Sequence, residues 1–136
     1  MKIEIIGPAP DIQSLNPIGQ CLNQLLQKAN PGKCKVLMLV AYVNETFFDC
    51  IGKSLESFAT SGGDLQFIVG IDSRGTSRKA LETLSNLPGS GRLYVYHNPG
   101  DGTFHPKMFI VRDEKKANVF VGSSNLTGGG LSNNLG

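Results

Sequence analysis

The sequence FHPKMFIV at residues 104–111 is typical of a β-strand, and a second apolar run, NVFV at residues 118–121, follows it after a charged turn. Alternate residues of a strand point to the same face, so we expect His105 and Lys107 to lie side by side. The second run leads into Gly-Ser-Ser-Asn at residues 122–125, where we expect a strand to end and a helix to begin. Backbone N–H groups at such a turn accept an anion readily.

The residue types that meet in these two segments suit a phosphoryl group. An imidazole can act as a nucleophile or proton carrier, an ammonium supplies a positive charge, and hydroxyl and amide groups donate hydrogen bonds. Taken alone, each residue has an ordinary structural explanation, and it is their conjunction in this order that favours a phosphoryl site. The candidates are His105, Lys107, Ser123, Ser124 and Asn125.

The pattern His-x-Lys followed by Gly-Ser-x-Asn resembles the signature of the phospholipase D superfamily. HPKMFIV with GSSNLTGGGL is most similar to its nuclease branch, which includes restriction-type endonucleases and nuclease domains attached to helicases. The resemblance implies that His105 attacks phosphorus to form a phosphohistidine, or serves as the acid, while a second histidine takes the other role. It also implies that Lys107 and Asn125 grip the phosphate oxygens, with Ser123 a weaker candidate.

Two positions depart from the family pattern. The family often has an aspartate five residues after the lysine, where this chain has Arg112 followed by Asp113. Nuclease-branch members tend to carry a glutamate about eleven residues after the asparagine, and that position here is Gly136. Either the site lacks this acid or the chain is a piece of a longer protein, because residues 130–136 begin like the approach to another element.

Length and composition indicate one globular domain over residues 1–136. The net charge of +2 is too small to indicate nucleic acid by itself. The N-terminal apolar run is too short for a signal peptide, and no run is long enough to span a membrane. An odd number of cysteines without CxxC spacing favours free thiols in a reducing compartment, so we expect a cytoplasmic protein. The cysteines are Cys21, Cys34 and Cys50.

The chain alternates strand-like and helix-like segments and then has consecutive strands, which predicts an α/β fold, a mixed β-sheet flanked by helices. The nearly unbroken apolar run over residues 34–43 predicts a central strand covered on both faces. Apolar periodicity predicts helices over residues 18–29, 45–60 and 77–87, and strands over residues 3–6, 34–43, 65–71, 92–97, 104–111 and 118–121.

The segment that follows the predicted strand 65–71 opens a helix, which is where open α/β sheets bind ligands. Its cations and hydroxyls could hold phosphates that flank the scissile one, and an ordinary solvated helix start is an equal alternative. The candidates for these nucleic-acid backbone contacts are Arg74, Thr76, Ser77 and Arg78. We expect His97 to be a structural or surface residue, and Arg112, Lys115 and Lys116 to form a charged hairpin tip.

The sequence predicts no metal site and no cofactor, because it has no Cys/His cluster, no HExxH and no group of carboxylates near His105. A single His-Lys motif supplies half of a two-histidine site, so we expect a homodimer whose paired His105 residues meet across a two-fold axis. The function expected is hydrolysis of nucleic acid, with DNA preferred over lipid as the substrate and no membrane partner. The alternatives are a phosphate-binding module without turnover and a phospholipid phosphodiesterase.

Overall fold

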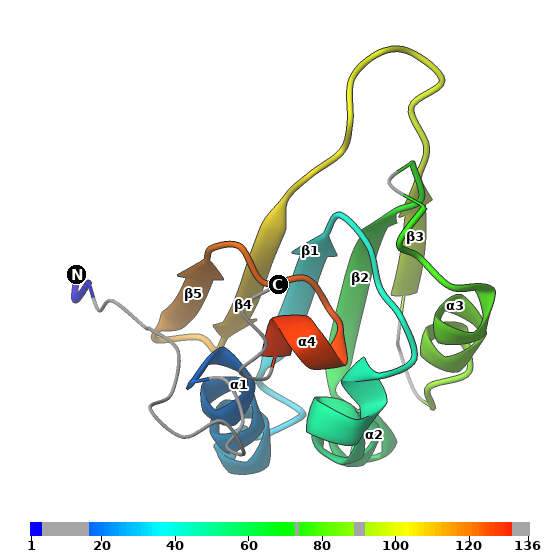
Figure 1. Ribbon diagram of the computed structural model, residues 1–136. Coiled ribbons are helices and arrows are strands. Elements are labelled where there is room, and N and C mark those ends of the chain that lie inside the picture. Colours follow the sequence, from blue (N-terminus) through cyan, green and yellow to red (C-terminus); the bar gives the residue numbers. More distant parts are fainter. Residues whose placement is uncertain (4–16, 73, 89–91, 132–136) are drawn as a thin grey trace.

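The computed structural model describes residues 1–3, 17–72, 74–88 and 92–131, which form a sheet covered by helices (Figure 1). The helices are α1 (Pro17–Lys28), the π-helix η1 (Phe48–Gly52), α2 (Lys53–Thr60), α3 (Arg78–Ser85) and α4 (Gly128–Leu131). The strands are β1 (Lys35–Val40), β2 (Asp64–Gly70), β3 (Arg92–Tyr96), β4 (Lys107–Arg112) and β5 (Ala117–Val121). The strand predicted over residues 3–6 lies, from residue 4 onward, outside the described residues.

The strands form one mixed sheet in the order β3-β2-β1-β4-β5. The first three strands run parallel, while β4 is antiparallel to both β1 and β5. The predicted α/β class with a mixed sheet is therefore confirmed. Because β4 and β5 are joined by a hairpin, the start of β4 and the end of β5 lie at the same edge of the sheet as the carboxyl ends of the three parallel strands.

The helices of the described residues cover one face of the sheet (Figure 1). The connections from β1 to β2 and from β2 to β3 both step to the next strand in the same direction. Right-handed crossovers therefore place α2 and α3 on the same face. On that face α1 packs against α2, and α4 packs against η1.

We expected residues 34–43 to be covered on both faces of the sheet, but the second face is only partly covered by the described residues. Val36, Met38 and Val40 are buried under the helices, whereas Leu37 and Leu39 on the other face are half-buried. The sequence hid this alternation because both faces of the strand carry apolar side chains. Tyr94, Val119 and Val121 continue the second face and are exposed.

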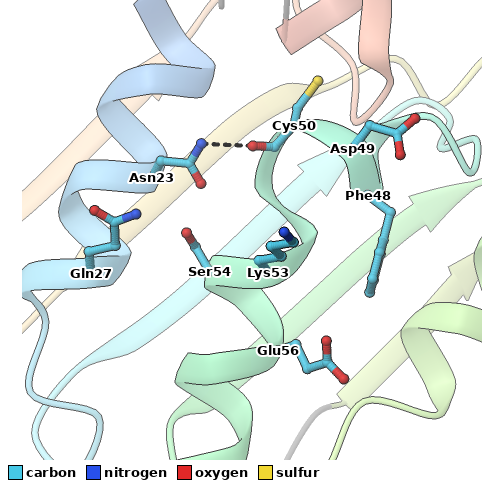
Figure 2. Close-up of a pocket in the computed structure, with 8 residues that line it drawn as sticks. All are labelled: Asn23, Gln27, Phe48, Asp49, Cys50, Lys53, Ser54 and Glu56. Atoms are coloured by element: carbon cyan, nitrogen blue, oxygen red, sulfur yellow. Dashed lines mark hydrogen bonds between the residues drawn. The ribbon is translucent and has the colours of Figure 1, made fainter.

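The predicted helix over residues 45–60 is divided into a π-helix and an α-helix. A Cβ atom on Gly52 would lie 2.5 Å from the ring of Phe48, so the ring occupies space that only glycine leaves open at this position. The wider π turn is tied to α1 by Asn23, whose Nδ2 donates to the carbonyl oxygen of Cys50 over 2.7 Å (Figure 2). π-helical turns are short local insertions rather than complete elements, which explains why apolar periodicity predicted a single helix here.

Candidate active site

The candidate site lies at the edge of the sheet where β1, β2 and β3 end, β4 begins and β5 ends. His105 lies two residues before β4, and Lys107 is the first residue of that strand. Asn125 lies four residues after the end of β5. The crevice outside the carboxyl ends of the strands is the usual ligand-binding position in open α/β sheets.

His105 and Lys107 form a close pair. Lys107 Nζ lies 2.7 Å from Nδ1 and 3.1 Å from Nε2 of His105, and 3.4 Å from the His105 carbonyl oxygen. The predicted side-by-side arrangement is therefore present, although His105 itself precedes the strand rather than lying in it. The ring is exposed and is not packed into the apolar core. Both ring nitrogens thus lie within 3.1 Å of the ammonium, and a ring nitrogen that carries a lone pair can act as a nucleophile.

Asn125 is buried at the end of β1, and 5% of its surface is exposed. Its Oδ1 accepts a hydrogen bond from the backbone N–H of Tyr42 over 3.3 Å. Val40 pairs with Lys107 in the sheet, so the end of β1 that leads to Tyr42 lies beside the start of β4. Asn125 therefore lies at the edge of the sheet where β4 begins. Among the described residues Nδ2 has no acceptor, so this amide group can donate to an anion.

The Gly-Ser-Ser-Asn segment is a turn, and the expectation that a helix begins there is wrong. Gly122 continues the sheet through its N–H, which donates to the Lys107 carbonyl over 3.2 Å. The short helix α4 begins only after Thr127, whose Oγ1 accepts from the Gly130 N–H over 2.8 Å. Small polar residues in a row favour turns as readily as helix starts, so the sequence alone did not separate the two.

The two serines of this turn differ in exposure. Ser123 is exposed, whereas Ser124 is buried, with 9% of its surface accessible to solvent. Within the described part of the chain neither hydroxyl has a hydrogen-bond partner. Ser123 is therefore the hydroxyl that a ligand at this edge reaches without rearrangement of the turn.

The predicted contacts after β2 divide into structural and free groups. Thr76 Oγ1 donates to the Gly70 carbonyl over 2.6 Å and accepts from the Val43 N–H over 3.2 Å. Ser77 Oγ accepts from the Ala80 N–H over 3.1 Å, so Ser77 is the N-cap of α3.

The two arginines of the same segment also differ. Arg78 pairs with Glu82 one helical turn later, with 2.7 Å between Nε and Oε1. Arg74 is exposed, adopts φ 57°, and has no partner among the described residues. Of the two, only Arg74 presents a cation that is free to meet a ligand.

One polar pair at this edge was missed in the sequence. His97 Nδ1 lies 2.6 Å from Asp72 Oδ1, and Asp72 Oδ2 accepts from the Asn98 N–H over 3.0 Å. The hydrogen bond from Asn98, followed by the one from His97, lowers the pKa of the Asp72 carboxyl. Asp72 lies two residues after β2 and His97 is the first residue after β3, the neighbouring parallel strand. That placement was the signal that could have predicted their contact.

The charged hairpin tip lies at the opposite edge of the sheet. The carboxylate of Asp113 accepts from the N–H groups of Lys115 and Lys116 over 2.7 and 2.8 Å, which shapes the turn between β4 and β5. Because β4 runs the length of the sheet away from Lys107, these lysines are remote from His105. Position 136, where the family pattern has an acid, lies outside the described residues.

A separate hollow of about 590 Å³ lies between α1 and the η1–α2 segment (Figure 2). Its lining includes Asn23, Asp49, Cys50 and Lys53, and none of the predicted site residues. Burial, and to a smaller extent Asp49, raises the pKa of the Cys50 thiol, so this cysteine is not an activated nucleophile. Among the described residues no cluster of His, Cys, Asp and Glu could hold a metal ion.

This edge of the mixed sheet therefore carries an imidazole paired with an ammonium, and a buried carboxamide in the segment that follows β5. The chain belongs to the phospholipase D superfamily, because the family model described as "Cardiolipin synthase, PLD-like domain" matches residues 22–135.

Comparison with solved structures supports the same fold. The structure is similar to NucT from Helicobacter pylori, with a TM-score of 0.59 and 22% sequence identity over 89% of this chain and 77% of that chain. A comparison with curated proteins found no match. No helix in the described part of the chain has the length and apolar character needed to cross a membrane.

Proposed function

We propose that this protein is a phosphodiesterase that hydrolyses nucleic acid, with DNA as the proposed substrate, without a metal ion and through a phosphohistidine on His105. The observation that carries the proposal is the exposed His105 ring held against Lys107, with 2.7 Å between Nζ and Nδ1. The buried amide of Asn125 supports it, because its fixed Oδ1 leaves Nδ2 as a donor at the same edge of the sheet.

The reaction takes place in two steps. A ring nitrogen of His105 attacks phosphorus, the bond from phosphorus to the leaving oxygen breaks, and a second imidazole gives that oxygen a proton. The same imidazole then removes a proton from water as the water oxygen attacks phosphorus, which breaks the nitrogen–phosphorus bond and releases a phosphomonoester. Lys107 and Asn125 neutralise the charge on the phosphoryl oxygens in both steps, as preorganised donors do.

The second imidazole is proposed to come from another copy of the chain. The sequence contains two histidines, and His97 follows β3, which is separated from β4 by two strands. His97 lies outside the His-x-Lys motif, and its Nδ1 is bound to Asp72 Oδ1 over 2.6 Å. A two-fold homodimer with paired His105 residues completes the site. Full activity from a species that sedimentation shows to be strictly monomeric would overturn this arrangement.

Phospholipid is the rival substrate, because the matching family model is described as a cardiolipin synthase domain. The similarity of HPKMFIV and GSSNLTGGGL to the nuclease branch favours nucleic acid. The test is hydrolysis of bis(p-nitrophenyl) phosphate by the wild type and by His105→Ala, followed by competition with DNA or with phospholipid vesicles. Inhibition by DNA alone supports the proposal, and inhibition by vesicles alone would assign the site to lipid.

Two further outcomes of this assay bear on the proposal. Hydrolysis that persists in EDTA is expected, because Lys107 and Asn125 supply the charge stabilisation. Activity that EDTA removes and one metal restores would refute the metal-independent mechanism. Absence of hydrolysis in the wild type, together with DNA binding, would instead indicate a binding module. The three free cysteines are consistent with the cytoplasmic location that we propose.

A further inference from the structure

We propose that His97, held by Asp72, forms with Arg74 a second anion subsite that binds a backbone phosphate flanking the scissile one. This inference rests on the proposed function in taking the ligand to be a nucleic acid strand. It assigns a role to the polar pair at the ends of β2 and β3, which the reaction at His105 does not use.

The Asp72 carboxylate is positioned to hold the imidazole of His97 and not to bind a ligand itself. Its side chain is 15% exposed, and its two oxygens are used by His97 Nδ1 at 2.6 Å and by the Asn98 N–H at 3.0 Å. The His97 side chain is 61% exposed. With Nδ1 bound to the carboxylate, Nε2 is the ring nitrogen left for a ligand, and in the imidazolium it donates to a phosphate oxygen.

Stability alone does not account for this arrangement. An ion pair with one partner as exposed as His97 contributes little to stability. The Asn98 N–H already ties the end of β3 to Asp72 without the imidazole. The ring therefore adds little to the joint between the two strands, whereas its fixed orientation reduces the entropy lost when it binds a ligand.

Arg74 supplies the permanent charge of the subsite. It lies two residues after Asp72, is exposed, and adopts φ 57°, in the left-handed region. A non-glycine residue in that region is strained, and such strain concentrates at functional sites. The guanidinium is charged at every working pH and can bind a phosphate through two parallel hydrogen bonds.

The spacing of the two sites suits one nucleic acid strand. The ends of β3 and β4 are separated by two strands, yet the ring of Tyr96, next to His97, stacks on the ring of Phe104, next to His105, with 4.5 Å between their centroids. A strand that follows this edge from His105 toward β3 therefore passes His97 and Arg74 within a few nucleotides of the scissile phosphate. A diester without flanking phosphates reaches only the first site.

The test is binding of a fluorescein-labelled 20-nucleotide DNA strand, measured by anisotropy at several salt concentrations. The variants are His97→Ala and Arg74→Gly. Glycine tolerates φ 57°, so Arg74→Gly removes the charge without loss of folding. We expect each to weaken binding about five- to tenfold, and Arg74→Gly to lower the salt slope by about one. Lys33→Ala is the control, because Lys33 is an exposed cation near the start of β1, at the opposite edge.

The outcomes separate the subsite from the catalytic proposal. Equal binding by the two variants and Lys33→Ala, or no binding of the DNA strand by the wild type, would overturn the subsite. Weakened binding by both variants supports it, even where neither DNA nor bis(p-nitrophenyl) phosphate is hydrolysed, and in that case the proposed catalysis alone fails. If the small diester is hydrolysed and both variants bind DNA as the wild type does, the catalytic proposal is supported and the subsite proposal is wrong.

Discussion

Asn125 accepts a hydrogen bond from the backbone N–H of Tyr42, so the segment that follows β5 is attached to the end of β1. The bond determines which way the amide faces, because Oδ1 is engaged by the backbone and Nδ2 is the remaining donor. Leu126 strengthens the attachment through a parallel bridge to Val43, and its carbonyl accepts from the Asn44 N–H over 3.3 Å. The position of this phosphate-binding candidate therefore depends on β1, a strand that carries no candidate residue.

Replacement of Asn125 should separate its two functions. In Asn125→Asp a carboxylate oxygen can still accept from the Tyr42 N–H, but the donor is replaced by a negative charge, so we expect diester hydrolysis to fall by about 10²-fold or more. In Asn125→Ala the Tyr42 N–H also loses its acceptor, and the free energy of unfolding should fall by about 1–3 kcal/mol as well. Urea unfolding and initial rates measure the two effects. Near wild-type rates in Asn125→Asp would contradict the assignment of Nδ2.

Lys107 should be required for its charge and not for its packing. Lys107→Met keeps the aliphatic stem but removes the ammonium that contacts His105, and we expect kcat to fall by roughly 10²–10³-fold, as when one preorganised donor is lost. Lys107→Arg retains a cation and should restore part of the rate. Lys33→Met at the opposite edge is the matched control. A loss in Lys107→Met no larger than in this control would show that the ammonium takes no part in the reaction.

The sequence predicted the parts of the site that depend on local spacing. His105 and Lys107 are two residues apart, and a strand places residues at that separation on one face. By contrast, Asn125 and Tyr42 are separated by 83 residues and His97 and Asp72 by 25, so their contacts arise from the order of strands in the sheet. The mixed sheet followed from the sequence of elements. The face of the sheet that no described helix covers did not, because apolar side chains occupy both faces of β1.

Thr76 should act as a structural residue, although it was a candidate for binding phosphate. Its hydroxyl joins the Gly70 carbonyl to the Val43 N–H, and thus the end of β2 to the chain after β1. Thr76→Val keeps the shape but leaves both backbone groups without this partner, so we expect the free energy of unfolding to fall by about 1–3 kcal/mol. Thr83→Val is the control, because its exposed hydroxyl bonds only the Lys79 carbonyl and its loss should cost about 0.5 kcal/mol or less. Equal urea midpoints for the two variants would contradict this role.

The stability of the folded protein should depend on pH in the acid range because of Asp72. Its pKa is lowered in the folded protein by the Asn98 N–H and by His97, so the folded state binds the proton less tightly than the unfolded state does. The stabilisation is therefore complete above the unfolded pKa of about 3.9 and is lost as the pH falls through the folded pKa. Asp72→Asn cannot ionise, so the difference in Tm between wild type and this variant should be constant near pH 6 and shrink below about pH 4.

Thermal melts from pH 6 to pH 2.5 measure this difference in Tm. The control is Asp101→Asn, because Asp101 is an exposed loop carboxylate without a described partner. A difference that stays the same over the whole range would show that the Asp72 carboxylate contributes no charge-dependent stability.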